Sequence, residues 1–212
     1  MADEIILYYS VASRSFTAFW MLEELGIPYR REERDRRKKE NLSPDYLRLN
    51  PMGHVPTLKI GSTVVSENPA ICIYLADRFS YGSLAPEIDE PDRGAYLKWL
   101  VFTTSVLEPV AALNGATITY PTGREPQWGP NWGSLDQVVK VLANALTGRA
   151  FLLGDRFGAA DIMLGSAISM RLFTNMLPPD PVLTSYNERL KSRPARQRAE
   201  QLTWPPNLFA SS

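Results

Sequence analysis

Apolar runs and amphipathic segments alternate along the start of the chain. Ile5–Tyr9 is an apolar run of strand length, and apolar residues then recur at helical spacing as far as Leu25. Gly26 and Pro28 are typical of a helix end, and Tyr29–Glu33 predicts a second strand. The pattern therefore begins as a β-α-β unit.

A hairpin followed by a helix closes this first part. Thr57–Ile60 and Thr63–Ser66 are rich in β-branched residues, and Gly61-Ser62 between them suits a two-residue turn. The residues from Ser66 to Pro69 then offer capping side chains and a proline suited to a first helical turn, which predicts a helix through Phe79. With a helical or irregular stretch before the hairpin, the order predicts an α/β, thioredoxin-like domain with a mixed four-stranded sheet.

Strand patterns fade after residues 81–91, which are rich in Gly, Pro and acidic residues and are typical of a linker. Pro109 should end or kink the first helix beyond the linker. Helical patterns cover Asp92–Leu113, Leu135–Leu146, Asp161–Phe173 and Val182–Lys191. The sequence thus predicts a sheet domain over residues 1–80, a linker over 81–91 and an all-α domain over 92–212.

Composition and charge exclude several kinds of protein. Hydrophobic residues make up 44% of the 212 residues and charged residues 22%, as in ordinary globular chains. The net charge is zero, so attraction to nucleic acid or to an anionic membrane has no global basis. The single Cys excludes an intrachain disulfide. One Cys and one His provide too few ligands for a typical structural zinc site, and we expect no metal. With no signal-peptide pattern at the start, we expect a cytoplasmic protein.

Five motifs in order carry a resemblance to a known family. The first combines Ser13-Arg14-Ser15, Trp20 and the run Leu22–Tyr29. The next four are, in chain order, Asn50–Pro56 (NPMGHVP), Glu67–Ile71 (ENPAI), Leu84-Ala85-Pro86 before the linker, and Gly158–Asp161 (GAAD). Together they resemble the cytosolic glutathione S-transferase family, and the front motif resembles its bacterial, serine-type members. The departures are Asn68, where the family usually has Ser, and Gly158, where it has a Ser or Thr cap.

The resemblance implies that the first domain binds glutathione as a co-substrate. Glu67 would pair with the free α-amino group, and Asn68 with the helix N-terminus would hold the α-carboxylate. The main chain of Val55, next to a cis Pro56, would bond the cysteinyl part as an added strand does. Either His54 or Lys39 would lie near the glycyl carboxylate. The glutathione-binding residues expected on this basis are His54, Val55, Pro56, Glu67, Asn68 and Lys39. From the residues alone, helix capping and an exposed loop histidine remain alternatives.

Ser13 is the expected catalytic residue, as a hydroxyl donor that stabilises the glutathione thiolate at the start of the first helix. Ser15 could exchange roles with it as the helix cap. Ser10 and Tyr8 are the other rivals, the second because tyrosine-type transferases carry their hydroxyl near that place. Cys72 lies among apolar residues of the third helix and is expected to be a buried structural thiol.

The resemblance implies a transferase that adds glutathione to small hydrophobic electrophiles, acting as a homodimer. Alternatives on the same fold are a glutathione-dependent disulfide or peroxide reductase, a maleyl-type cis-trans isomerase, and a non-catalytic binding module. Aromatic residues between the domains could form the electrophile site, although core packing is the simpler interpretation of each. The candidates are Phe102, Tyr120, Trp128, Trp132, Trp204 and Phe209.

Overall fold

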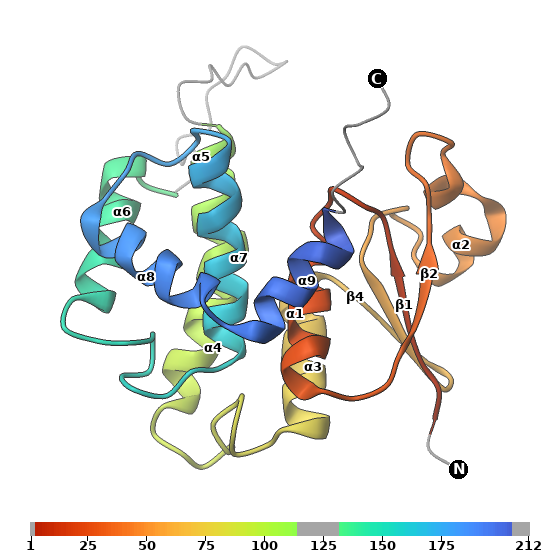
Figure 1. The fold of residues 1–212 in the computed structure, drawn as a ribbon, viewed down its shortest axis with the longest axis horizontal. Coiled ribbons are helices and arrows are strands. Elements are labelled where there is room, and N and C mark those ends of the chain that lie inside the picture. The colour runs from red at the N-terminus through yellow and green to blue at the C-terminus, as the bar shows by residue number, and fades with distance from the viewer. Residues whose placement is uncertain (1–2, 114–131, 205–212) are drawn as a thin grey trace, which may run out of the picture.

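A four-stranded mixed sheet forms the centre of the first part of the computed structural model, which describes residues 3–113 and 132–204 (Figure 1). The strand order is β2-β1-β3-β4, with β1 parallel to β2 and antiparallel to β3. The strands are β1 (Ile5–Tyr9), β2 (Arg30–Glu33), β3 (Thr57–Ile60) and β4 (Thr63–Ser66). The sheet predicted from the sequence is confirmed.

Side-chain alternation along β1 divides the helices between the two faces of the sheet. Leu7 and Leu58 are fully buried in the main core beneath α1 (Ser15–Leu25) and α3 (Asn68–Phe79). Ile6 and Tyr8 point to the opposite face, where α2 (Pro44–Leu49) covers them. Figure 1 shows α1 and α3 between the sheet and the remaining helices, and α2 on the far side.

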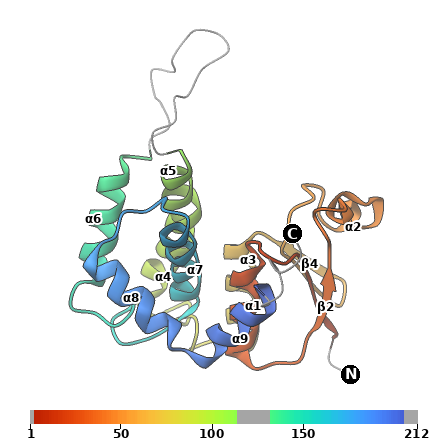
Figure 2. The ribbon, with the colours of Figure 1, turned by 45° about the horizontal axis from the view of Figure 1, so that its top comes forward.

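The regular elements among the described residues of the second part of the molecule are all helical (Figure 2). A 3₁₀ turn, η1 (Glu40–Leu42), belongs to the first part, before α2. The helical elements of the second part are α4 (Arg93–Phe102), the π-helical turn η2 (Thr103–Leu107), α5 (Glu108–Ala112), α6 (Leu135–Leu146), α7 (Ala159–Phe173), α8 (Pro181–Lys191) and α9 (Pro194–Thr203). Together with the sheet, this confirms the predicted fold class.

The interruption expected at Pro109 lies upstream of that residue. The chain widens into the π-helical turn η2, where Glu108 donates its N–H to the Thr103 carbonyl, and stays helical to Ala112. Pro109 occupies the first turn of α5, directly after the π-helical turn. Proline therefore continues this helix, and the π-helical turn provides the break.

The sequence pattern did not predict α9, although this helix joins the two parts. Arg193, at its start, forms a two-pronged pair with Glu24 of α1 at 2.6 and 2.8 Å. The same carboxylate accepts from Trp20 Nε1 at 2.9 Å. At the other end, the Ala12 N–H donates to the Thr203 carbonyl at 2.9 Å. The last described helix thus holds α1 along its whole length.

The start of α7 explains the glycine at position 158. Asp161 accepts from the Gly158 N–H at 3.0 Å, which is one half of the expected capping box. A Cβ on Gly158 would lie 2.7 Å from the Leu84 carbonyl oxygen, while the next N–H donates to that oxygen at 2.8 Å. Close contact between the linker and α7 therefore requires glycine at position 158.

Gly158→Ala should destabilise the fold by about 1–3 kcal/mol, because the added methyl group overpacks against main-chain atoms. Gly94→Ala is the matched control, since a Cβ there meets no atom within 4 Å and alanine favours a helix. Urea unfolding of both variants measures the effect. Equal stability of the two variants would contradict the steric explanation.

Stability should also depend on pH through Asp161. Its carboxylate accepts from Leu152 N–H, Gly158 N–H and Tyr186 Oη at 2.8–3.0 Å, yet burial raises its pKa to about 6. An unfolded Asp has a pKa of about 3.9, so between these values the folded chain binds more protons and stability falls as pH rises.

Relative to Asp161→Asn, the wild-type free energy of unfolding should therefore fall by on the order of 2–3 kcal/mol from pH 4 to pH 7. Urea unfolding of both proteins at the two pH values measures this difference. A difference that stays constant or grows would show that Asp161 ionises easily in the fold.

Candidate functional site

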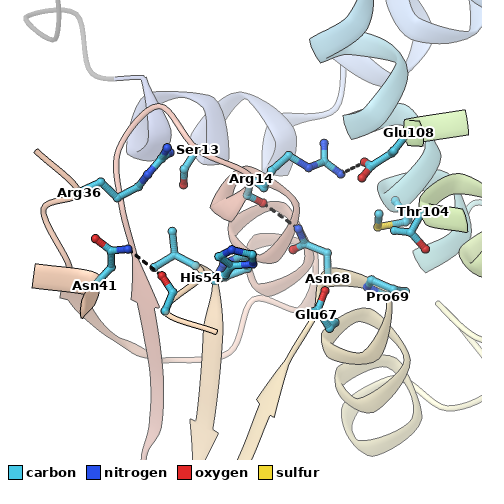
Figure 3. Close-up of a pocket in the computed structure, with 14 residues that line it drawn as sticks. Ser13, Arg14, Arg36, Asn41, His54, Glu67, Asn68, Pro69, Thr104 and Glu108 are labelled. Atoms are coloured by element: carbon cyan, nitrogen blue, oxygen red, sulfur yellow. Dashed lines mark hydrogen bonds and ion pairs between the residues drawn. The ribbon is translucent and has the colours of Figure 1, made fainter. Parts of the chain in front are cut away.

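A cavity of about 460 Å³ lies where the N-terminal ends of α1 and α3 meet the helical part (Figure 3). Its walls come from both parts of the chain, which are far apart in sequence. In the view of Figure 3, Arg36 and Asn41 lie at one end, Thr104 and Glu108 at the other, and His54 and Asn68 between. The lining residues are Ser13, Arg14, Arg36, Asn41, Gly53, His54, Val55, Pro56, Glu67, Asn68, Pro69, Thr104, Glu108 and Met163.

A hydrogen-bond network fixes the serine loop before α1. Ser13 Oγ donates to the Ser10 carbonyl at 2.6 Å, accepts from the Ser15 N–H at 3.1 Å and lies 2.9 Å from Ser15 Oγ. All three serines are buried, and of the three Ser13 lines the cavity. A ligand atom in the cavity can therefore accept a hydrogen bond from the Ser13 hydroxyl, provided that this hydroxyl rotates away from the Ser10 carbonyl.

Tyr8 lies on the other face of the sheet. Its ring packs 5.7 Å from that of Tyr46 on α2, and the Arg34 guanidinium lies 5.1 Å from its centre. This placement follows from alternation along β1, because Leu7 faces α1 and its neighbour must face away. Tyr8 is absent from the cavity lining.

Two polar residues at the start of α3 line the cavity beside the serine loop. Glu67 has φ of 67° and ψ of 122°, a conformation rare outside glycine, and its side chain is exposed. Non-glycine residues held in such conformations cluster at ligand sites. Asn68 is buried, and its Nδ2 donates to the Arg14 carbonyl at 3.1 Å. Its Oδ1 is a buried acceptor without a partner among the described residues.

The loop between α2 and β3 supplies His54, Val55 and Pro56, and its Val55–Pro56 peptide bond is cis. The His54 side chain is exposed, whereas its carbonyl accepts from Tyr46 Oη at 2.6 Å and Asn50 Nδ2 at 2.9 Å. Two buried side chains therefore hold this loop from beneath. The sequence pattern gave no signal for their role, because it arises from packing between elements.

The basic end of the cavity differs in detail from expectation. Lys39 is exposed with φ of 58° and is absent from the lining, whereas Arg36 and Asn41 line the cavity. Asn41 Nδ2 donates to the Gly53 carbonyl at 2.7 Å, so this side chain joins two loops. Residues 34–39 contain several cations in irregular turns, where no periodicity indicates which one faces inward.

The opposite wall comes from the helical part and carries charge. Arg14 forms an ion pair with Glu108 of α5, and Arg171 Nη1 of α7 lies 3.7 Å from the same carboxylate oxygen. Thr104 of η2 and Met163 of α7 complete this wall. Apart from Arg14, which belongs to the front motif, no sequence motif indicates the residues of this wall, since α5 and α7 approach α1 through tertiary packing alone.

The predicted aromatic residues that the structure describes lie outside the lining of this cavity. Phe102 packs edge-on against Trp99, with ring centres 5.5 Å apart, and Trp204 lies 4.9 Å from Phe16. Trp132 is half-buried against the main core. Tyr120, Trp128 and Phe209 lie outside the described residues.

Cys72 is fully buried, and this burial raises the pKa of its thiol to about 12, which is unsuited to nucleophilic chemistry. Among residues 3–113 and 132–204, no group of three or more His, Cys, Asp or Glu side chains could hold a metal ion. In the same residues, no helix has the length and apolar character needed to cross a membrane.

Both the sequence and the fold of this chain are similar to those of known proteins. The model of the glutathione S-transferase N-terminal domain matches residues 13–78. Glutathione S-transferase GstB of Escherichia coli strain K12 is 31% identical over 182 residues, covering 82% of this chain and 86% of GstB. Two solved structures are also similar. One is the theta class glutathione S-transferase of Xanthomonas axonopodis pv. citri with glutathione bound (31% identity, TM-score 0.71, 93% of this chain and 97% of that one).

The other is the ternary complex of BphK, a bacterial GST (28% identity, TM-score 0.75, 93% of this chain and 98% of that one). The matches to GstB and to the theta class structure each pair about 31% identity with coverage of most of both chains. This chain belongs to the glutathione S-transferase family.

Proposed function

We propose that this protein is a glutathione transferase that ionises the thiol of glutathione beside Ser13 and transfers it to small electrophiles. The observation that carries this proposal is the convergence of Ser13, Glu67 and Asn68 on one cavity. They come from two helix N-termini, where main-chain N–H groups favour anions. The related structure solved with glutathione bound supports the choice of co-substrate.

The cavity offers one group for each charged end of glutathione. Glu67 can bind the ammonium group. Asn68 Nδ2 already donates to the Arg14 carbonyl, so we assign the buried Oδ1 of Asn68 to accept a second hydrogen bond from the ammonium group, in place of the contact with the α-carboxylate expected from the sequence. The first N–H groups of α3 then face the α-carboxylate. Arg36 lies where it can bind the glycyl carboxylate. His54 and Lys39, which the sequence suggested for this role, remain the alternatives. The main chain of Val55 borders the middle of the cavity, where the cysteinyl residue would extend.

Ser13 would act as a hydrogen-bond donor to sulfur. A free thiol has a pKa of about 8.5, and lowering it by one unit requires about 1.4 kcal/mol of preference for the thiolate. One charge-assisted hydrogen bond supplies that much. The proton passes to solvent, the thiolate attacks the electrophilic carbon, and the leaving group departs with the electron pair of its bond. Ser15, Ser10 and Tyr8 remain the rivals to Ser13.

We also propose the finer assignments that the sequence suggested. Ser13 and the bacterial relatives favour a bacterial, serine-type member, and the need for reduced glutathione favours the cytoplasm. The divisions at residues 80 and 91 fall between the end of α3 and the start of α4. A homodimer is supported by exposed apolar residues on β4, α3 and α4, namely Val64, Phe79, Leu97 and Val101.

We expect the protein to bind immobilised glutathione and to conjugate it to a chlorodinitrobenzene. The same preparation is tested for glutathione-dependent disulfide reduction, peroxide reduction and maleyl isomerisation. Conjugation as the dominant activity supports the transferase, and a dominant activity elsewhere in the panel assigns one of the alternatives. Retention without any activity would indicate a binding module, and neither retention nor activity would contradict the proposal.

Ser13→Ala should lower turnover by about 10–100-fold, because one hydrogen bond to a charged sulfur contributes about 1.5–3 kcal/mol. The affinity for glutathione should change little, while the pKa of the bound thiol should rise by about one to two units. Steady-state kinetics and titration of thiolate ultraviolet absorbance measure these effects. Tyr8→Phe is the control, and a larger loss in that variant than in Ser13→Ala would assign the catalytic hydroxyl to Tyr8.

A further inference from the structure

Two arginines and one glutamate form a charged cluster at the end of the cavity next to the helical part, where Arg14 and Glu108 line the cavity and Arg171 lies behind Glu108. Arg14 directly follows Ser13, and its Nη2 donates to Glu108 Oε1 (Figure 3). Arg171 approaches the same oxygen at 3.7 Å. Two guanidinium groups thus share one carboxylate, and the three charges sum to one excess positive charge.

Arg171 carries its charge where water reaches poorly. Arg171 is 8% exposed, its Nε has no partner among the described residues, and its Nη1 also donates to the Ala167 carbonyl at 3.3 Å. Burial lowers the pKa of Arg171 and the charge of Arg14 lowers it further, whereas Glu108 raises it. A buried cation with an incomplete counter-charge is costly, so an added anion nearby would stabilise the cluster.

Arg14 is the member of the cluster that can reach such an anion. It lines the cavity, and its side chain is 30% exposed. A guanidinium has five N–H donors in a planar fork that matches a carboxylate, and the ion pair with Glu108 occupies one side of that fork. Arg171 lies behind Glu108 and holds it, which leaves Arg14 only partly neutralised.

Glutathione does not supply this anion in the binding mode proposed above. Its α-carboxylate would lie at the start of α3, and its glycyl carboxylate near Arg36, at the end of the cavity opposite Glu108 (Figure 3). An ion pair that simply joined the two parts of the molecule would need one arginine. The second arginine therefore favours a role in binding.

We propose that the electrophilic substrate carries a carboxylate group, which Arg14 binds while Arg171 acts as a positioning residue through Glu108. This inference rests on the transferase function proposed above and narrows its substrate class to acidic electrophiles. The body of the substrate would lie between the thiol at Ser13 and the carboxylate at Arg14, against Met163 and Thr104.

A chlorodinitrobenzoate and its methyl ester provide the test, because they share the reacting carbon and differ in charge. Each kcat/KM is divided by the rate constant of the uncatalysed reaction with glutathione, which corrects for intrinsic reactivity. We expect the wild-type protein to prefer the acid by about tenfold or more, the effect of one charge-assisted pair.

Substitutions in the cluster should change this acid-to-ester ratio in opposite directions. Arg14→Gln should lower the ratio about tenfold. Arg171→Gln should lower it severalfold, because Glu108 is then no longer shared and neutralises more of the charge of Arg14. Glu108→Gln should raise the ratio, because it removes a competing carboxylate. Arg198→Gln, a surface variant that loses a pair with Glu23, is the control and should change neither rate.

Thermal unfolding of every variant establishes that it is folded before its ratio is interpreted. Equal corrected wild-type rates on the acid and the ester would overturn the inference and leave the proposed transferase function standing. A ratio that falls in Glu108→Gln as it does in Arg14→Gln would also overturn it and assign the cluster to joining the two parts. Conjugation of neither compound would overturn both the inference and the proposed function.

Discussion

The burial of α1 is the constraint on which the rest of the structure depends. Eight of its eleven residues are buried, so it must be covered on every side. The sheet covers one side through Leu7 and Leu58, and α7 and α9 cover the other. Trp20 has no exposed surface and belongs to the same core as Leu7 and the apolar side of α7. Neither part of the molecule can bury this helix alone.

This constraint also determines where a ligand can bind. The N-terminus of a helix packed between two parts opens into the cleft between them, and Ser13 lies there. The loop before the helix is held by Thr203 of α9 through Ala12, and by Asn68 of α3 through the Arg14 carbonyl. The hydroxyl that would meet the thiol is therefore positioned by elements from both parts, which suits a site that must be preorganised.

Local sequence signals predicted the elements whose pattern is local. The hairpin was predictable because β-branched runs flank Gly61, which has φ of 57°. By contrast, α9 buries Ala195, Arg196, Ala199 and Thr203, a face of small and polar residues with no apolar periodicity. Sequence motifs had named six residues that line the cavity, namely Ser13, His54, Val55, Pro56, Glu67 and Asn68. By contrast, Arg14, Glu108 and Arg171 come together only through packing of α1, α5 and α7.

Asn68 shows how one departure from the family pattern changes the connections of a site. A serine in this place has a single side-chain oxygen, so donation to the Arg14 carbonyl and acceptance from a ligand would have to share that one atom. The amide of Asn68 donates through Nδ2 to that carbonyl and keeps Oδ1 as a separate acceptor. The end of the cavity that we propose for the γ-glutamyl group is therefore linked through a single side chain to the loop that carries Ser13.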